Sequence, residues 1–131
     1  MKHFISIFIF FICFANCKAQ ASIQTGDWQW RYQNKHETIF SIENADGTTL
    51  VFNYCSVYFD GQKIDCNQDR QFELYSLNTY EYEGVFHSDF SDFSIKLKII
   101  FNSDFTEFET QILNQPLGEF YFPDAVKFKK D

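Results

Sequence analysis

Residues 93–101 read Phe-Ser-Ile-Lys-Leu-Lys-Ile-Ile-Phe, and this stretch decides the fold class. Apolar residues take alternate positions, with Ser94, Lys96 and Lys98 between them. Successive side chains on a β-strand point to opposite faces, so a period of two predicts a strand with one buried face and one solvated face. No window after residue 20 has apolar residues at helical spacing. The chain is therefore expected to be all-β.

The same alternation recurs along the rest of the chain. It predicts strands at residues 28–32, 38–43, 48–54, 55–59, 62–66, 71–75, 80–87, 94–101, 106–113 and 125–129. The third and fourth of these ranges can also be read as one long strand. Short connections favour pairing between neighbours in sequence. We expect an antiparallel meander of about nine short strands, forming a small calycin-like barrel or a strongly curled sheet, because closure removes exposed edges.

The first predicted hairpin turns at Asn44-Ala45-Asp46-Gly47. This sequence fits a type I turn with Gly47 in the left-handed conformation. Closing the hairpin with Asn44 opposite Thr48 places Phe40 opposite Phe52 and puts apolar residues face to face.

The second predicted hairpin turns at Asp60-Gly61. A two-residue loop there places Cys55 directly opposite Cys66. Facing residues of antiparallel strands have their Cβ atoms close enough for a disulfide, and an even cysteine count suits an oxidising compartment. We therefore predict a structural Cys55–Cys66 disulfide.

Residues 1–19 have the pattern of a signal peptide. The apolar run Phe4–Phe14 follows a short basic start and is too short to span a bilayer as a helix. Two processing routes are open: cleavage after Ala19, or lipidation of Cys17 as in a lipoprotein. Both leave a single all-β domain, taken as residues 20–131.

The composition excludes several protein classes. The chain has 131 residues, is 45% hydrophobic and 21% aromatic, and carries a net charge of −7. Such a chain can bury enough surface to fold, so it is not disordered. Its acidity argues against nucleic acid as a partner, because phosphates require a basic face. Removing the leader takes away Lys2 and Lys18 and no acidic residue, which makes the exported domain more acidic still.

The sequence contains no recognisable catalytic motif of a hydrolase, a metalloprotease or a phosphate-binding loop. His36 lies in a polar turn, and His87 is followed by Ser88 and Asp89. Consecutive strand residues point to opposite faces, so these three cannot form a triad with one another. We predict no catalytic residue, no cofactor and no enzymatic activity.

Two groups of acidic residues have a spacing found in metal or catalytic sites. Asp65-x-Asn67-x-Asp69 resembles the first half of a calcium loop but lacks the Gly and Glu that complete one. A plain acidic turn is the preferred interpretation, and no metal site is predicted. Glu81 and Glu83 share one strand face. They can be read as the paired carboxylates of a small hydrolase or as the ordinary solvent face of a strand, which is the preferred interpretation.

The segment Gly26-Asp27-Trp28 resembles the Gly-x-Trp that opens lipocalin-type barrels. In that family the Trp plugs the base of the barrel, and an Arg from a late strand packs on it. The late strand here offers Lys127 and Lys129 instead. The resemblance implies a barrel architecture.

A second resemblance covers nearly the whole chain. The sequence is similar to a family of small exported or lipid-anchored Gram-negative proteins known only as a domain of unknown function. The matching features are Cys17-Lys18-Ala19-Gln20, Gly26-Asp27-Trp28 with Trp30, the strand Thr38–Ile42, the Asp60-Gly61 hairpin, and the closing segment Phe122–Lys130. In that family Ser precedes the leader Cys, where this chain has Asn16. The resemblance implies an envelope location and an all-β domain, and it brings no functional residue.

Three functional hypotheses follow. The first is a non-enzymatic binding or interaction module in the periplasm or on the outer membrane, with a protein partner and with membrane attachment only through Cys17. The second is a carrier of a small apolar or aromatic ligand, with a cavity lined by Trp28, Trp30, Phe40, Phe52 and Tyr82. The third is a small hydrolase. A carrier requires a void, an interaction module an exposed aromatic patch, and a hydrolase two carboxylates in one cleft.

Overall fold

The computed structural model describes residues 21–58 and 63–131. The predicted signal peptide, Cys17 and the Asp60-Gly61 turn therefore lie outside the described residues. The described part contains nine β-strands and no helix. The strands are β1 (Gly26–Tyr32), β2 (His36–Ala45), β3 (Thr49–Tyr58), β4 (Lys63–Cys66), β5 (Phe72–Ser76), β6 (Glu81–Ser88), β7 (Phe93–Phe101), β8 (Glu107–Ile112) and β9 (Lys127–Lys130).

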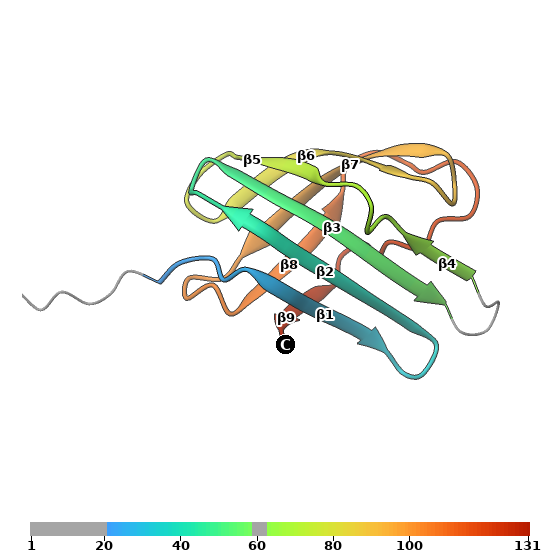
Figure 1. Ribbon diagram of the computed structural model, residues 1–131, viewed down its shortest axis with the longest axis horizontal. Helices are drawn as coiled ribbons and strands as arrows, with labels where there is room; N and C mark the ends of the chain where they lie inside the picture. The colour runs from blue at the N-terminus through green and yellow to red at the C-terminus, as the bar shows by residue number, and fades with distance from the viewer. Residues whose placement is uncertain (1–20, 59–62) are drawn as a thin grey trace, which may run out of the picture.

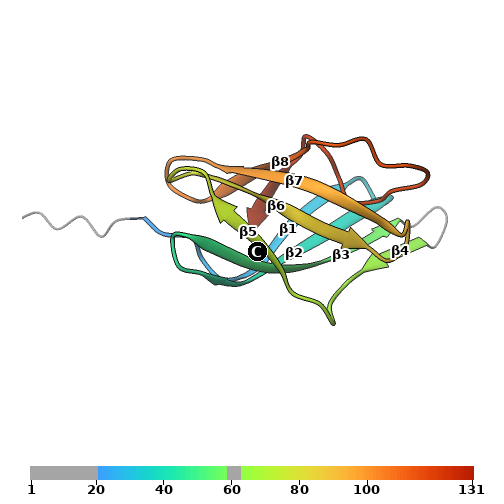
Figure 2. The ribbon, with the colours of Figure 1, turned by 90° about the horizontal axis from the view of Figure 1, so that it is seen from above.

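Eight of the strands close into a small antiparallel barrel (Figures 1 and 2). The hydrogen-bonded order around the wall is β1, β9, β8, β7, β6, β5, β3 and β2, and β2 pairs again with β1. β9 is the strand that closes the barrel, because it pairs with both β8 and β1. The predicted all-β antiparallel fold is confirmed, and the barrel is the architecture adopted.

Strand β3 combines the two ranges 48–54 and 55–59 into one long strand, which explains how one strand has three neighbours. Its first half, Thr49–Phe52, pairs with β5, and its second half, Cys55–Tyr58, pairs with β4. β2 runs along the other edge of β3. Among the described residues β4 pairs only with β3, so it is an extra strand beside the barrel wall (Figure 1).

The predicted disulfide is confirmed. Cys55 and Cys66 face each other in the register of β3 and β4 and are joined through their sulfur atoms. Val57 faces Ile64 in the same register, as the predicted turn requires.

The predicted register of the first hairpin is wrong. Phe40 faces Tyr54 rather than Phe52, and a bulge lies between Ile42 and Asn44. Phe40 and Phe52 remain on the same inward face, and their rings stack diagonally with centroids 4.3 Å apart.

The reason for this register is the side chain of Asp46. Its Oδ1 accepts hydrogen bonds from the backbone N–H groups of Thr48 and Thr49, at 2.9 and 2.8 Å. These hydrogen bonds close the turn around Gly47, whose φ of 89° lies in the predicted left-handed region. The bulge between Ile42 and Asn44 accommodates the resulting change of register.

Aromatic rings fill the barrel interior. Phe108 and Phe128 stack with centroids 4.9 Å apart, and Trp28 packs against Phe108 at 5.3 Å. Trp28, Phe40 and Phe128 are all fully buried. Small barrels are commonly filled in this way, and here the filling leaves the two ends of the barrel as the places where rings reach solvent.

Candidate functional site

The inward-facing rows of three neighbouring strands end in rings at one end of the barrel. On β1, Trp30 and Tyr32 follow the buried Trp28 on the same face. His36 at the start of β2 faces Tyr32 on one side and Tyr58 at the end of β3 on the other. The alternation that builds the core therefore also carries aromatic side chains to this mouth.

Two connecting segments bring further rings to the same mouth. Phe90 lies in the turn between β6 and β7, and Tyr121 lies in the long segment between β8 and β9. Tyr121 stacks on Tyr58 with centroids 5.4 Å apart, and Phe90 meets it edge-on at 5.0 Å. We call the whole group the aromatic rim: Trp30, Tyr32, His36, Tyr58, Phe90 and Tyr121.

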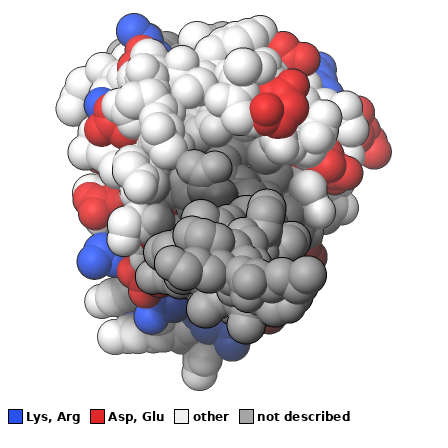
Figure 3. All heavy atoms as spheres, turned by 90° about the vertical axis from the view of Figure 1, so that its left-hand side faces the viewer, with Lys and Arg blue, Asp and Glu red and all other residues white. Residues whose placement is uncertain are grey.

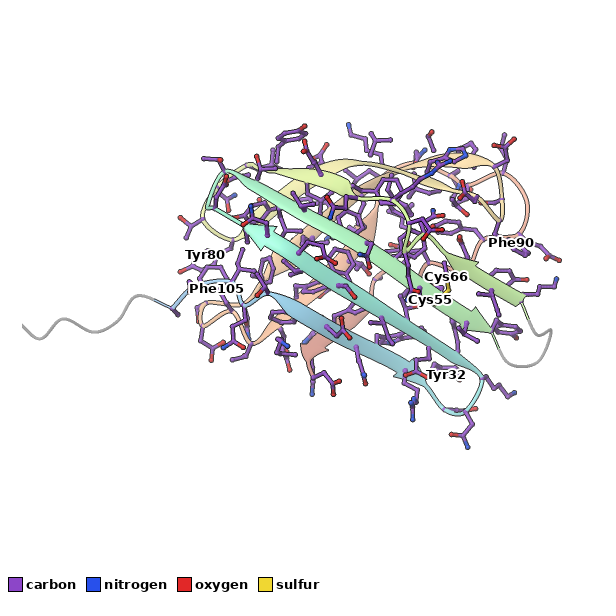
Figure 4. The ribbon with its side chains drawn as sticks, in the orientation of Figure 1. Tyr32, Cys55, Cys66, Tyr80, Phe90 and Phe105 are labelled. Atoms are coloured by element: carbon purple, nitrogen blue, oxygen red, sulfur yellow. A yellow bond between two sulfur atoms is a disulfide. The ribbon has the colours of Figure 1, made fainter. Side chains whose placement is uncertain are left out.

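The rim combines packed and exposed rings. Tyr32 is 56% exposed and Phe90 is 39% exposed. Figure 4 places these two side chains at one end of the barrel, and Tyr80 and Phe105 at the other. A contiguous set of rings that meets solvent marks a candidate contact surface.

His36 is the centre of the rim. Its ring packs edge-to-face with Trp30 at 4.9 Å and with Tyr58 at 5.7 Å. Its Nε2 atom is buried and has no hydrogen-bond partner within residues 21–58 and 63–131. Burial lowers the pKa of His36, and a hydrogen bond to the backbone of Tyr121 opposes this only in part. The neutral ring is therefore the form that this packing favours.

Charged groups lie around the rim in pairs. Lys63 forms an ion pair with Glu119, and its Nζ lies 5.7 Å from the centre of the Tyr121 ring. Arg31 and Glu37 form a second pair at 3.0 Å. An apolar centre within a polar margin is the usual anatomy of a protein-binding surface.

A buried polar network joins β3, β4 and β6. The Asp65 carboxylate accepts hydrogen bonds from the Tyr54 hydroxyl at 3.0 Å and from the Ser88 hydroxyl at 2.7 Å. Asn67 donates through Nδ2 to the carbonyl of His87 at 2.5 Å, while its buried Oδ1 has no partner among the described residues. Burial raises the pKa of Asp65 despite these donors. The network links β4 to the barrel wall by side chains.

Sequence reasoning missed this network, although the disulfide register contained the signal. With Cys55 opposite Cys66, Asp65 must face Ser56. Ser56 lies two residues after Tyr54 on the inward face, so the same register points Asp65 inward. The calcium-like spacing instead spans two buried side chains, Asp65 and Asn67, and an exposed Asp69. Within the described ranges, no three or more His, Cys, Asp or Glu side chains form a group that can hold a metal ion.

The other candidate chemical residues pair with other partners and do not form a common cleft within the described part of the chain. His87 contacts Asp92 at 3.1 Å, whereas the neighbouring Ser88 points inward to Asp65. Glu81 and Glu83 are paired with Lys98 and Lys96 on the outside of β7, at 3.5 and 3.1 Å. Each of these two carboxylates therefore faces a lysine.

The residues expected to line a ligand cavity have different positions. Trp28, Phe40 and Phe52 lie in the filled core and contact other rings. Trp30 belongs to the rim. Tyr82 lines a hollow at the end of the barrel opposite the rim.

Comparison of the chain with protein-family models, curated proteins and solved structures finds no match. Over residues 21–58 and 63–131, no segment forms a helix with the length and hydropathy needed to cross a membrane.

Proposed function

We propose that this protein is a non-enzymatic binding module of the bacterial envelope, and that its aromatic rim binds a protein partner. The observation that carries the proposal is the run of ring contacts from Trp30 through His36, Tyr58 and Tyr121 to the exposed Phe90. The exposed Tyr32 lies opposite His36 on the neighbouring strand. Aromatic residues are enriched in the centres of protein interfaces.

The filled interior favours this function over that of a carrier with an internal ligand. Phe40 and Phe52 stack at 4.3 Å, and Phe108 packs against Phe40 at 5.0 Å. These rings take the place that a ligand has in eight-stranded carrier barrels. An accessible rim over a solid core suits contact with a macromolecule.

The position of the rim suits an exported domain. The chain reaches β1 at the end of the barrel opposite the rim, since Gly26 begins the strand that ends at Tyr32 (Figure 1). We propose that residues 1–19 direct export and that Cys17, where it is lipidated, holds this first end toward the membrane. The rim then faces away from the membrane and is free to meet a partner.

Site-specific photo-crosslinking in the producing cell tests the binding function. The photoreactive amino acid p-benzoylphenylalanine replaces Tyr32 or Phe90, and in a matched control it replaces Tyr80, which is exposed at the other end. We expect a discrete protein adduct from both rim positions and none from the control. Adducts from Tyr80 alone, or no protein adduct from either rim position, contradict the proposal.

Mass spectrometry of the protein from an envelope fraction tests the proposed export. An N-terminus at Gln20, or an acylated Cys17, agrees with one of the two processing routes. A chain that retains Met1 and the whole leader contradicts export.

A further inference from the structure

A hollow of about 440 Å³ lies at the end of the barrel opposite the rim. Its apolar walls come from Ile23, Ala45 and Phe105, and its polar groups include Asp46, Thr79 and Tyr82. This volume lies in the range of small-molecule sites, which commonly occur at the mouths of β-barrels.

Among the described residues, the Tyr82 hydroxyl is a polar group of this hollow without a hydrogen-bond partner. Tyr82 is only 2% exposed, and its ring packs edge-on against Phe101 at 6.1 Å. Within the described part of the chain its hydroxyl makes no hydrogen bond. A tyrosine hydroxyl that lines a hollow can donate or accept a hydrogen bond, so the Tyr82 hydroxyl offers a polar anchor to a bound molecule.

Phe105 forms a preorganised wall. Its backbone has a φ of 55°, in the left-handed region that aromatic residues rarely adopt. Asn102 stabilises this loop by accepting hydrogen bonds from the backbone of Thr106 at 2.9 Å and of Glu107 at 3.1 Å. The Phe105 ring packs against Tyr80 at 5.4 Å (Figure 4). The wall is therefore in place before any ligand arrives, which lowers the entropic cost of binding.

Asp46 places a negative charge beside the hollow. Its carboxylate is held in the β2–β3 turn by Thr48 and Thr49 and lies beside the hollow. Burial and the charge of Asp46 both raise the pKa of Tyr82, so the two side chains interact electrostatically. Figure 3 shows both acidic and basic side chains around this face of the molecule, and the charge nearest to the hollow is that of Asp46. An anionic ligand is disfavoured there.

We propose that this hollow, the Tyr82 pocket, binds a small neutral or cationic aromatic molecule through a hydrogen bond to the Tyr82 hydroxyl. The site is separate from the rim and does not depend on the function proposed for it. It differs from an internal carrier cavity because it lies at the mouth, above the filled core.

Two dyes with the same ring system test the site. N-phenyl-1-naphthylamine is neutral, and 8-anilinonaphthalene-1-sulfonate adds one sulfonate to the same skeleton. The protein is expressed from its full gene and purified as the cell processes it. Binding is followed by energy transfer from Trp28 and Trp30, the only tryptophans, so that dye elsewhere in the sample contributes little.

We expect the neutral dye to bind saturably, with one dye per chain, and at least about tenfold more tightly than the sulfonate. Tyr82→Phe removes only the hydroxyl, so it should weaken binding of the neutral dye about two- to tenfold without changing thermal stability. Tyr32→Phe also removes one hydroxyl, but at the opposite end of the barrel, so it is the matched control and should bind the neutral dye as the wild type does. Asp46→Asn keeps an oxygen that can accept the hydrogen bonds of the turn, but it removes the negative charge. This variant should therefore show a smaller difference in affinity between the neutral dye and the sulfonate dye.

Two results overturn the proposal. One is absent or non-saturable binding of the neutral dye. The other is equal affinity of the wild type and Tyr82→Phe, which means that the dye binds away from the Tyr82 hydroxyl. Neither result bears on adduct formation at Tyr32 or Phe90, so the rim and the pocket are tested independently.

Discussion

The hydroxyl of Ser88 on β6 donates a 2.7 Å hydrogen bond to the carboxylate of Asp65 on β4. Both side chains are buried, and the two strands are not paired through their backbones in the described residues. The disulfide ties β4 covalently to β3. The hydrogen bond between Ser88 and Asp65 attaches β4 to a second strand of the barrel, β6. A side-chain hydrogen bond therefore connects β4 to β6, which are not joined by backbone hydrogen bonds in the described residues.

The buried carboxyl should make stability depend on pH. Burial raises the pKa of Asp65 above its value in the unfolded chain. The folded protein therefore holds this proton more tightly, and the associated stability is complete below the unfolded pKa, about 3.9, and lost as pH rises through the folded pKa. Asp65→Asn carries no such proton. We expect the wild type to lose stability relative to Asp65→Asn as pH rises from about 3.5 to 7, measured by urea unfolding at each pH.

All other titrating groups are the same in the wild type and in Asp65→Asn. Their contributions therefore cancel in the difference between the two unfolding free energies. A difference that stays constant across the range would mean that Asp65 has the same pKa in both states.

His36 should show the opposite dependence. Its pKa is lowered in the folded protein by burial in the rim. The stability it contributes is present above the unfolded pKa, about 6.5, and is lost as pH falls through the folded pKa. His36→Phe keeps a ring in the cluster and cannot be protonated. The wild type should lose stability relative to His36→Phe between about pH 7 and 5, as read from thermal midpoints. Parallel profiles would contradict this prediction.

The disulfide should contribute to the stability of the whole domain. Cys55 and Cys66 are 11 residues apart, and a loop of this length is worth about 3 kcal/mol in the chain-entropy account. The double variant with both cysteines changed to Ser should be less stable by about that amount in urea unfolding. The wild type measured in reducing buffer is the control and should lose a similar amount. No loss in either sample would show that the unfolded chain gains no freedom when the bond is absent.

Gly84 on β6 is required where β5 comes close. A Cβ atom at this position would lie 2.4 Å from the backbone oxygen of Glu73 and 2.9 Å from a methyl group of Leu74. The backbone cannot yield easily, so Gly84→Ala should destabilise the fold by about 1–3 kcal/mol. Val85→Ala on the next, exposed position is the control, with a change within about 0.5 kcal/mol. Equal effects of the two substitutions would show that β5 can move away.

Several features of the fold could be predicted because they depend on neighbours along the chain. Alternating side chains identified the strands, and the spacing around Asp60-Gly61 identified the Cys55–Cys66 pair. The first hairpin could not be placed correctly, since its register depends on whether the backbone of Thr48 or the carboxylate of Asp46 closes the turn. Pattern alone is equally satisfied by both registers, because a shift of two residues keeps every side chain on its face.

The candidate sites were less predictable than the strands. The alternation marks Trp30 and Tyr82 as candidate binding residues. It marks Trp28, Phe40 and Phe52 in the same way, although these three lie in the filled core. Whether an inward ring ends in the core, at the rim or beside the Tyr82 pocket depends on its height in the barrel. Height follows from strand tilt and stagger, which one strand does not determine.

The strands, their buried faces and the disulfide can be predicted from the chain alone, because each follows from the period of two and from short turns. The tertiary fold adds the pairing of β9 with β1, in which Lys130 faces Trp28 and the barrel closes. It also decided that Phe90 and Tyr121 join the rings of β1, β2 and β3, and that Asp65 lies buried beside Ser88. These contacts join residues distant along the chain, and their free energy exists only once the whole wall has formed.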